Sequence, residues 1–196
     1  MLIMQRHPNL LDPTSSAFLV VDLQGKLFDN VVDKSRVEKN VCALIRFADV
    51  MGVPVILTEH YPKGLGSTVK PILDAFERLP KNSKNAKMEK VEFSCFQNEA
   101  ISEKLSSLSV DTFVVMGIET HICITQTCLD GLGRRYRMHV VEDACSSRTK
   151  PSHDCGIEKM RDSGCIVDST EMVIYEMLNT SKHPKFKEVL QIVKEI

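Results

Sequence analysis

Apolar residues in this chain cluster into short runs that alternate with longer stretches in which they recur at helical spacing. The runs are rich in Val, Ile, Leu and Phe, which is typical of β-strands. This pattern predicts six strands, over residues 17–22, 53–58, 88–93, 112–116, 137–143 and 165–167. Helical spacing predicts helices over residues 33–50, 97–108, 123–133, 153–163, 171–178 and 185–196. Residues 59–87 are the least regular stretch, and we expect one short helix there within a long surface loop.

Strands that alternate with helices in this way predict right-handed βαβ units and therefore a parallel sheet. The first run, AFLVVD, is apolar at every position before its final acid, as in a strand that is buried on both faces. We therefore predict a three-layer α/β/α fold with a six-stranded, mainly parallel sheet of Rossmann-type topology. In open sheets of this kind, ligands bind beyond the carboxyl ends of the strands.

Length and composition agree with one such fold. The chain has 196 residues, of which 43% are apolar and 26% are charged, so we expect a single domain over residues 1–196. The net charge is −1, and no apolar stretch approaches the length of a membrane span. Neither nucleic acid nor membrane is therefore an expected partner. Seven cysteines, without a C-x-x-C pair or zinc-like spacing, indicate free thiols in a reducing compartment such as the cytoplasm.

Cys123 lies between a predicted strand that ends at Gly117 and a predicted helix that begins after a short polar turn. A thiolate in the first turn of a helix lies near the positive end of the helix dipole and near unpaired backbone N–H groups. We therefore expect a lowered thiol pKa and a nucleophilic Cys123. The alternative is a small buried hydrophobic residue, the usual fate of a free cysteine.

Two further reactive groups follow other predicted strands, Asp22 after the first and Lys90 near the third. Asp22 could accept the thiol proton and later deliver it to a leaving group, while Lys90 keeps Asp22 ionised and stabilises the thiolate. Backbone N–H groups at the start of the helix could then receive an oxyanion. Taken singly, Asp22 could instead cap a loop, and Lys90 could be a solvated surface lysine.

Five separate segments carry a recognisable order and spacing: VVDLQGKLF, TEHYPKGLGST, KVEFSCF, GIETHICITQT and VVEDACSSR. In these segments the chain resembles the isochorismatase-like cysteine hydrolase superfamily, most closely the branch of isochorismatase domain-containing proteins. The resemblance extends from about residue 17 to the tail HPKFKEVLQIVKE. It implies a triad of Asp22, Lys90 and Cys123, in which Cys123 forms a covalent intermediate.

The resemblance also implies a cis peptide bond between Ile118 and Glu119, so that the N–H groups of Glu119 and Cys123 form an oxyanion hole. The residues implied to line the substrate pocket are Gln24, Phe28, Tyr61, Phe93, Ile118 and Ile122. For any one of the apolar residues among them, core packing is an equal alternative. Cys95 could also approach the site because it follows Lys90 by only five residues.

The chain departs from the metal-binding members of the superfamily, the nicotinamidases, which carry an Asp-x-His motif and further histidines after the second strand. The corresponding stretch, TEHYPKGLG, offers only Glu59 and His60, too few for the ligands of a zinc site. We therefore expect no metal, no cofactor and no nicotinamidase activity. Isochorismate is not an expected substrate either, because no evident ligands for that diacid are present.

Together these features predict a metal-independent cysteine hydrolase that cleaves a C–N or C–O bond of a small amide, carbamoyl or ether-like substrate. The resemblance implies assembly as a homo-oligomer, either a dimer or a tetramer. Two alternatives stay open, a ribonuclease and a non-enzymatic binding member of the same fold. A nuclease is less favoured because phosphodiester cleavage calls for metals, paired histidines or a basic groove.

Overall fold

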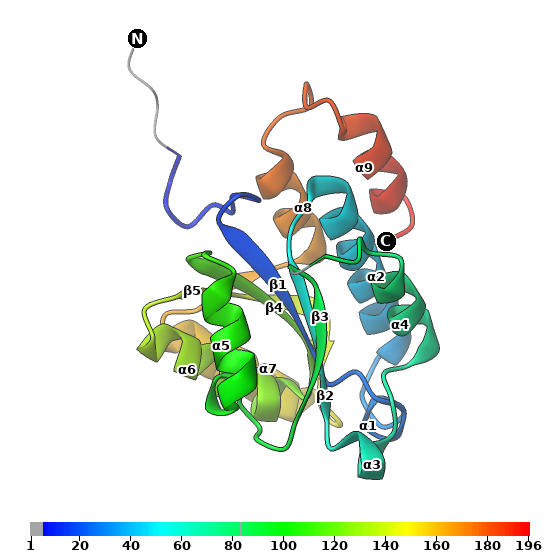
Figure 1. Cartoon of the computed structure of the whole chain (residues 1–196), viewed down its shortest axis with the longest axis vertical. Coiled ribbons are helices and arrows are strands. Elements are labelled where there is room, and N and C mark those ends of the chain that lie inside the picture. The colour runs from blue at the N-terminus through cyan, green and yellow to red at the C-terminus, as the bar shows by residue number, and fades with distance from the viewer. Residues whose placement is uncertain (1–5, 83) are drawn as a thin grey trace.

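The computed structural model describes residues 6–82 and 84–196, and its centre is a six-stranded sheet (Figure 1). Neighbouring strands are parallel throughout, in the order β3-β2-β1-β4-β5-β6. The strands are β1 (Ser16–Val21), β2 (Val55–His60), β3 (Ala86–Lys90), β4 (Thr112–Ile118), β5 (Arg137–Ser146) and β6 (Ile166–Asp168). The predicted six-stranded, mainly parallel sheet is confirmed. Residues 1–5 and 83, which the predicted domain includes, lie outside the described residues.

Helices cover both faces of the sheet, which confirms the three predicted layers (Figure 1). One face carries α2 (Lys34–Met51), α4 (Lys70–Glu77), α8 (Thr170–Leu178) and α9 (Phe186–Val193). The other face carries α5 (Glu99–Ser107), α6 (Thr125–Gly133) and α7 (Lys150–Asp162). Shorter turns are α1 (Gly25–Phe28), α3 (Pro62–Leu65), the 3₁₀ turn η1 (Cys95–Gln97) and the π-helical turn η2 (Thr120–Ile124). In the described parts of the chain, none of the helices combines the length and apolar character that crossing a membrane requires.

The strands contribute to two separate cores because successive side chains of a strand point to opposite faces of the sheet. In β1, Phe18 and Val20 join the core on the α2 side, whereas Ala17, Leu19 and Val21 join the core on the α6 side. All five side chains are inaccessible to solvent. β1 is therefore buried on both faces, as its unbroken apolar run predicts.

The stretch 59–87 is more ordered than predicted, since it holds two helices, α3 and α4, instead of one. A proline occupies the first turn of each, Pro62 in α3 and Pro71 in α4. Proline disrupts the interior of a helix but suits its first turn, where the missing N–H has no intrahelical partner. The same reason explains why α7 begins at Lys150, just before Pro151, rather than at residue 153.

The strand order reverses beside β1. The chain builds β2 and β3 on one side of β1 and then crosses to β4 on the other side. Open α/β sheets bind ligands beyond the carboxyl ends of the strands at such a reversal. Asp22 follows β1 and Glu119 follows β4, so both lie at this position.

Candidate active site

Asp22 directly follows β1 and is completely buried. Its backbone N–H donates to Thr58 O at 3.1 Å and so extends the ladder between β1 and β2 by one residue. Its φ of 56° lies in the left-handed region, which costs a non-glycine residue about 1–3 kcal/mol. The fold therefore holds Asp22 in a single backbone conformation that is unfavourable for a residue other than glycine.

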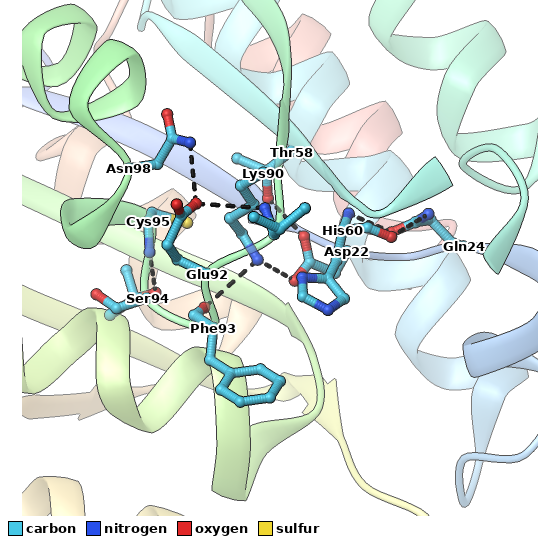
Figure 2. A network of polar contacts seen from close by, with 12 residues as sticks. Asp22, Gln24, Thr58, His60, Lys90, Glu92, Phe93, Ser94, Cys95 and Asn98 are labelled. Atoms are coloured by element: carbon cyan, nitrogen blue, oxygen red, sulfur yellow. Dashed lines mark hydrogen bonds and ion pairs between the residues drawn. The ribbon is translucent and has the colours of Figure 1, made fainter. Parts of the chain in front are cut away.

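Lys90 ends β3, and its side chain forms a buried ion pair with Asp22 (Figure 2). Burial disfavours the charged ammonium, but the Asp22 carboxylate together with the neighbouring thiols of Cys95 and Cys123 raises the pKa of Lys90 overall. Lys90 Nζ also donates to Phe93 O at 3.4 Å. The ion pair therefore places the Lys90 ammonium against the Asp22 carboxylate, beside the point where the strand order reverses.

Cys123 lies inside the π-helical turn η2 and is 6% exposed. Its thiol lies close to both members of the pair and experiences the negative charge of Asp22 and the positive charge of Lys90. The structure thus brings together the three side chains that the sequence places at separate strand ends.

The expectation of a lowered thiol pKa is wrong. Burial raises the pKa of Cys123 well above its usual value, the Asp22 carboxylate raises it further, and Lys90 opposes these effects only in part. The expectation from the helix end left out the two dominant causes, which are the burial of the thiol and the Asp22 carboxylate that faces it. The thiol is therefore protonated at neutral pH, and its reactivity depends on transfer of its proton to a neighbouring base.

Two more polar groups surround Asp22. Thr58 of β2 is fully buried, and its hydroxyl donates to Asp22 Oδ1 at 2.8 Å. The sequence analysis did not select Thr58, and the only signal for it is a hydroxyl in the otherwise apolar run VILT. Cys95 is buried next to Thr58 and within the electrostatic reach of Lys90. Burial raises the pKa of the Cys95 thiol to about 11.

The turn that carries Cys123 is closely packed against α7. The peptide bond between Ile118 and Glu119, just before the turn, is cis. Gly156 of α7 faces the turn, and a Cβ on it would lie 3.0 Å from the backbone of His121. The absence of a side chain at Gly156 therefore lets α7 approach the turn directly.

Two of the predicted pocket residues lie beside the charged pair. Tyr61 and Lys90 line a cavity of about 350 Å³. Phe93 stacks on the ring of His60, with 5.6 Å between the ring centroids. Tyr61 and Phe93 are 53% and 51% exposed as residues, so apolar surface is available to a substrate near Lys90.

The other predicted pocket residues are more buried. The Gln24 amide donates to His60 O at 3.0 Å and to Gly66 O at 2.6 Å, and it accepts from His60 N at 2.6 Å. These bonds give Gln24 a role in holding the loop after β2 rather than a free amide for a substrate. Phe28 and Ile118 pack in the core on the α2 side, whereas Ile122 is half-buried against the opposite core.

Glu59 and His60 do not form a metal site. Glu59 Oε1 accepts hydrogen bonds from the N–H and the hydroxyl of Thr68, both at 2.8 Å. Burial lowers the pKa of His60, and Lys90 lowers it further, so the ring is neutral at neutral pH. Across the residues that the structure describes, no group of three or more His, Cys, Asp or Glu is placed to hold a metal ion.

Comparison with known proteins relates this geometry to a family. A family model described as Isochorismatase domain matches residues 16–172. Over 190 residues the chain is 37% identical to Isochorismatase domain-containing protein 2 of Xenopus laevis, and the match covers 97% of this chain and 89% of that protein. The structure of MAR1 Ribonuclease from Caenorhabditis elegans is similar at a TM-score of 0.86 and 34% identity, over 94% of this chain and 92% of that chain.

A more distant structure shares the fold. The YcaC gene product of Escherichia coli, an octameric hydrolase of unknown specificity, is similar at a TM-score of 0.82 and 19% identity, over 97% of this chain and 98% of that chain. The residues matched by the family model contain all six strands together with Asp22, Lys90 and Cys123. The chain belongs to the isochorismatase family.

Proposed function

We propose that this protein is a metal-independent cysteine hydrolase that acts on a small amide, carbamoyl or ether-like substrate. One observation carries the proposal, namely the buried Asp22–Lys90 ion pair against the thiol of Cys123. A carboxylate beside a protonated thiol is a general base in position, and a fixed ammonium favours the thiolate that results.

The first chemical step joins Cys123 to the substrate. Asp22 takes the thiol proton, and the sulfur forms a bond to the carbonyl carbon of an amide. The backbone N–H groups of Glu119 and Cys123 would stabilise the resulting oxyanion. When the C–N bond breaks, the proton on Asp22 passes to the leaving amine, which departs and leaves a thioester on Cys123.

The second step regenerates the enzyme. A water molecule gives one proton to Asp22, and its oxygen adds to the thioester carbon. The C–S bond then breaks, the acid departs and the proton on Asp22 returns to the sulfur. Lys90 remains an ammonium throughout, because it faces the Asp22 carboxylate in the resting state and the negative charge on Cys123 or the oxyanion while Asp22 holds the proton.

A screen of small amides and carbamates tests this proposal. Cys123→Ala should abolish turnover of any substrate found, with a loss of at least about a thousandfold. Cys155→Ala is the matched control, because Cys155 is also a free cysteine but lies exposed on α7. Equal activity of the Cys123→Ala variant and the native protein would reject the nucleophile.

A ribonuclease is the second candidate, supported by the likeness to MAR1 Ribonuclease at 34% identity. Its test is cleavage of a single-stranded RNA by purified protein, compared with the Asp22→Ala variant. Cleavage by the native protein that this variant loses would favour the ribonuclease. Cleavage that persists unchanged in the variant would identify a contaminant.

We further propose that the protein forms a homo-oligomer in a reducing compartment such as the cytoplasm. The octameric state of YcaC supports assembly, and seven free cysteines support the compartment. Light scattering coupled to size exclusion distinguishes a dimer or larger assembly from a 22.1 kDa monomer.

A further inference from the structure

The carboxylate of Asp22 is held by two partners on different strands (Figure 2). One oxygen, Oδ2, pairs with the Lys90 ammonium of β3. The other, Oδ1, accepts a hydrogen bond of 2.8 Å from the hydroxyl of Thr58 in β2. All three side chains are buried, so water does not compete for these contacts.

The hydroxyl of Thr58 is not needed for the packing of β2. The other residues of the strand before it, Val55, Ile56 and Leu57, are apolar and fully buried. Valine has nearly the shape of threonine and would fill the same space. The backbone of Thr58 is paired with β1 and β3 independently of its side chain. The hydroxyl therefore serves its hydrogen-bond partners rather than the sheet.

The direction of this hydrogen bond follows from the chemistry of the two groups. A hydroxyl has one proton to donate, and an ionised carboxylate can only accept. The proton of Thr58 therefore points at Asp22, and the lone pairs of its oxygen face away. Cys95 is buried beside Thr58.

We infer that Thr58 is a positioning residue whose hydroxyl holds Asp22 in the orientation that accepts the proton of Cys123. This inference rests on the proposed function. Without the hydroxyl, Oδ1 loses its fixed partner, and the carboxylate is free to rotate away from the thiol. Loss of a donor also favours the protonated form of a carboxyl group, which cannot act as a base.

Other charged and titratable groups also face Asp22. They are Lys90 from β3, His60 from β2, Cys95 from η1 and Cys123 from η2. All of them remain when Thr58 is changed to valine. A shift in the pH dependence of that variant therefore reports the lost hydroxyl and not a changed set of charges.

The test is the rate at which iodoacetamide alkylates Cys123, followed by peptide mass spectrometry between pH 5 and 9. In this reaction the sulfur bonds to the CH₂ carbon, iodide leaves and Asp22 takes the thiol proton. Thr58→Val should slow alkylation at neutral pH about tenfold, the effect of losing one hydrogen bond to an ionised group. The fall of the alkylation rate at acidic pH, which we call the acidic limb, should begin at a higher pH in Thr58→Val. Thr58→Ser should restore both the native rate and the native pH dependence.

Thr127→Val is the matched control. Thr127 is also a fully buried threonine, but its hydroxyl accepts from Cys95 N at 3.0 Å. Thermal unfolding of all variants shows that each is folded at the assay temperature. If Thr58→Val alkylates like the native protein, or if Thr127→Val shifts the acidic limb equally, the inference is wrong. If Asp22→Asn alkylates as fast as the native protein, the proposed function is at fault instead.

Discussion

Two buried acid–base pairs lie in the same sheet, Asp22 with Lys90 and His139 with Asp168. The exposed side-chain fractions are 0% for both members of the first pair and 1% for both members of the second. His139 Nδ1 lies 2.7 Å from Asp168 Oδ2, which joins β5 to the edge strand β6. Asp168 also lines a cavity of about 510 Å³, larger than the cavity of about 350 Å³ beside Lys90. Burial does not distinguish the two pairs, and cavity size alone would favour the second pair as the site.

The two pairs differ in what they face. The Asp22 carboxylate faces the Cys123 thiol at the reversal of strand order. Cys165, three residues before Asp168, instead packs beside Cys128 in the core on the α6 side. A buried acid–base pair therefore indicates a reactive site only when a group that can react lies against it.

Removal of the Asp22 carboxylate should give the largest difference in alkylation rate between variants of the two pairs. In Asp22→Asn, alkylation of Cys123 by iodoacetamide at neutral pH should slow by about 100-fold or more, because an amide cannot accept the thiol proton. In Asp168→Asn the rate per folded molecule should stay within about twofold, since Asp168 does not contact the thiol. Peptide mass spectrometry at several reaction times measures both rates, with exposed Cys155 as the internal reference. Equal slowing in the two variants would remove the distinction between the pairs.

The second pair should instead affect stability. Asp168→Ala removes the hydrogen-bond partner of His139, so the free energy of unfolding should fall by about 1.5–3 kcal/mol. Chemical denaturation followed by circular dichroism measures this change. An unchanged midpoint would show that the second pair contributes nothing to the fold.

The pH dependence of the alkylation rate of Cys123 tests whether Asp22 acts as the base. The pKa of Cys123 is raised above its usual value of 9.0, so below that pH the thiolate is a small fraction of the thiol. In Asp22→Asn this fraction stays small because burial, the largest cause of the raised pKa, remains, so alkylation should increase about tenfold per pH unit between pH 7 and 9. The native protein should show a shallower rise, because Asp22 removes the proton at the moment of reaction. Parallel slopes would contradict a base at position 22.

Substitution of the exposed apolar side chain of Phe93, near Lys90, should have the smallest effect on catalysis. Phe93→Ala removes the ring that stacks on His60, so KM should rise by about three- to tenfold while kcat changes little. Leu10→Ala is the control, because Leu10 is another exposed apolar side chain but precedes the amino end of β1. Steady-state kinetics on a substrate from the amide screen compares the two variants. A loss confined to kcat would place Phe93 in the chemistry rather than in binding.

Most of the fold could be predicted from the sequence because β1, β2 and β4 are buried on both faces and read as unbroken apolar runs. The positions of Asp22 and Lys90 followed from the rule that ligands meet the carboxyl ends of parallel strands. The helices α3 and α4 were less predictable, since Pro62 and Pro71 mark helix starts as well as loops.

The environment of the thiol could not be derived from local sequence. The raised pKa of Cys123 depends on burial and on Asp22, which is 101 residues away in the chain. The contact between Thr58 and Asp22 depends on the register of two strands that the sequence does not specify. Such contacts arise only when the sheet is assembled, whereas a strand end is visible in the sequence itself.

The most direct measurement of the central proposal is the mass of the Cys123 peptide when a reactive small amide or ester is mixed with the protein and quenched in acid. We predict an acyl group on Cys123, removable by hydroxylamine as a thioester should be, and its accumulation in the native protein but not in Asp22→Asn. Turnover without any acyl group on Cys123, or an acyl group on exposed Cys155 in its place, would contradict the proposed mechanism.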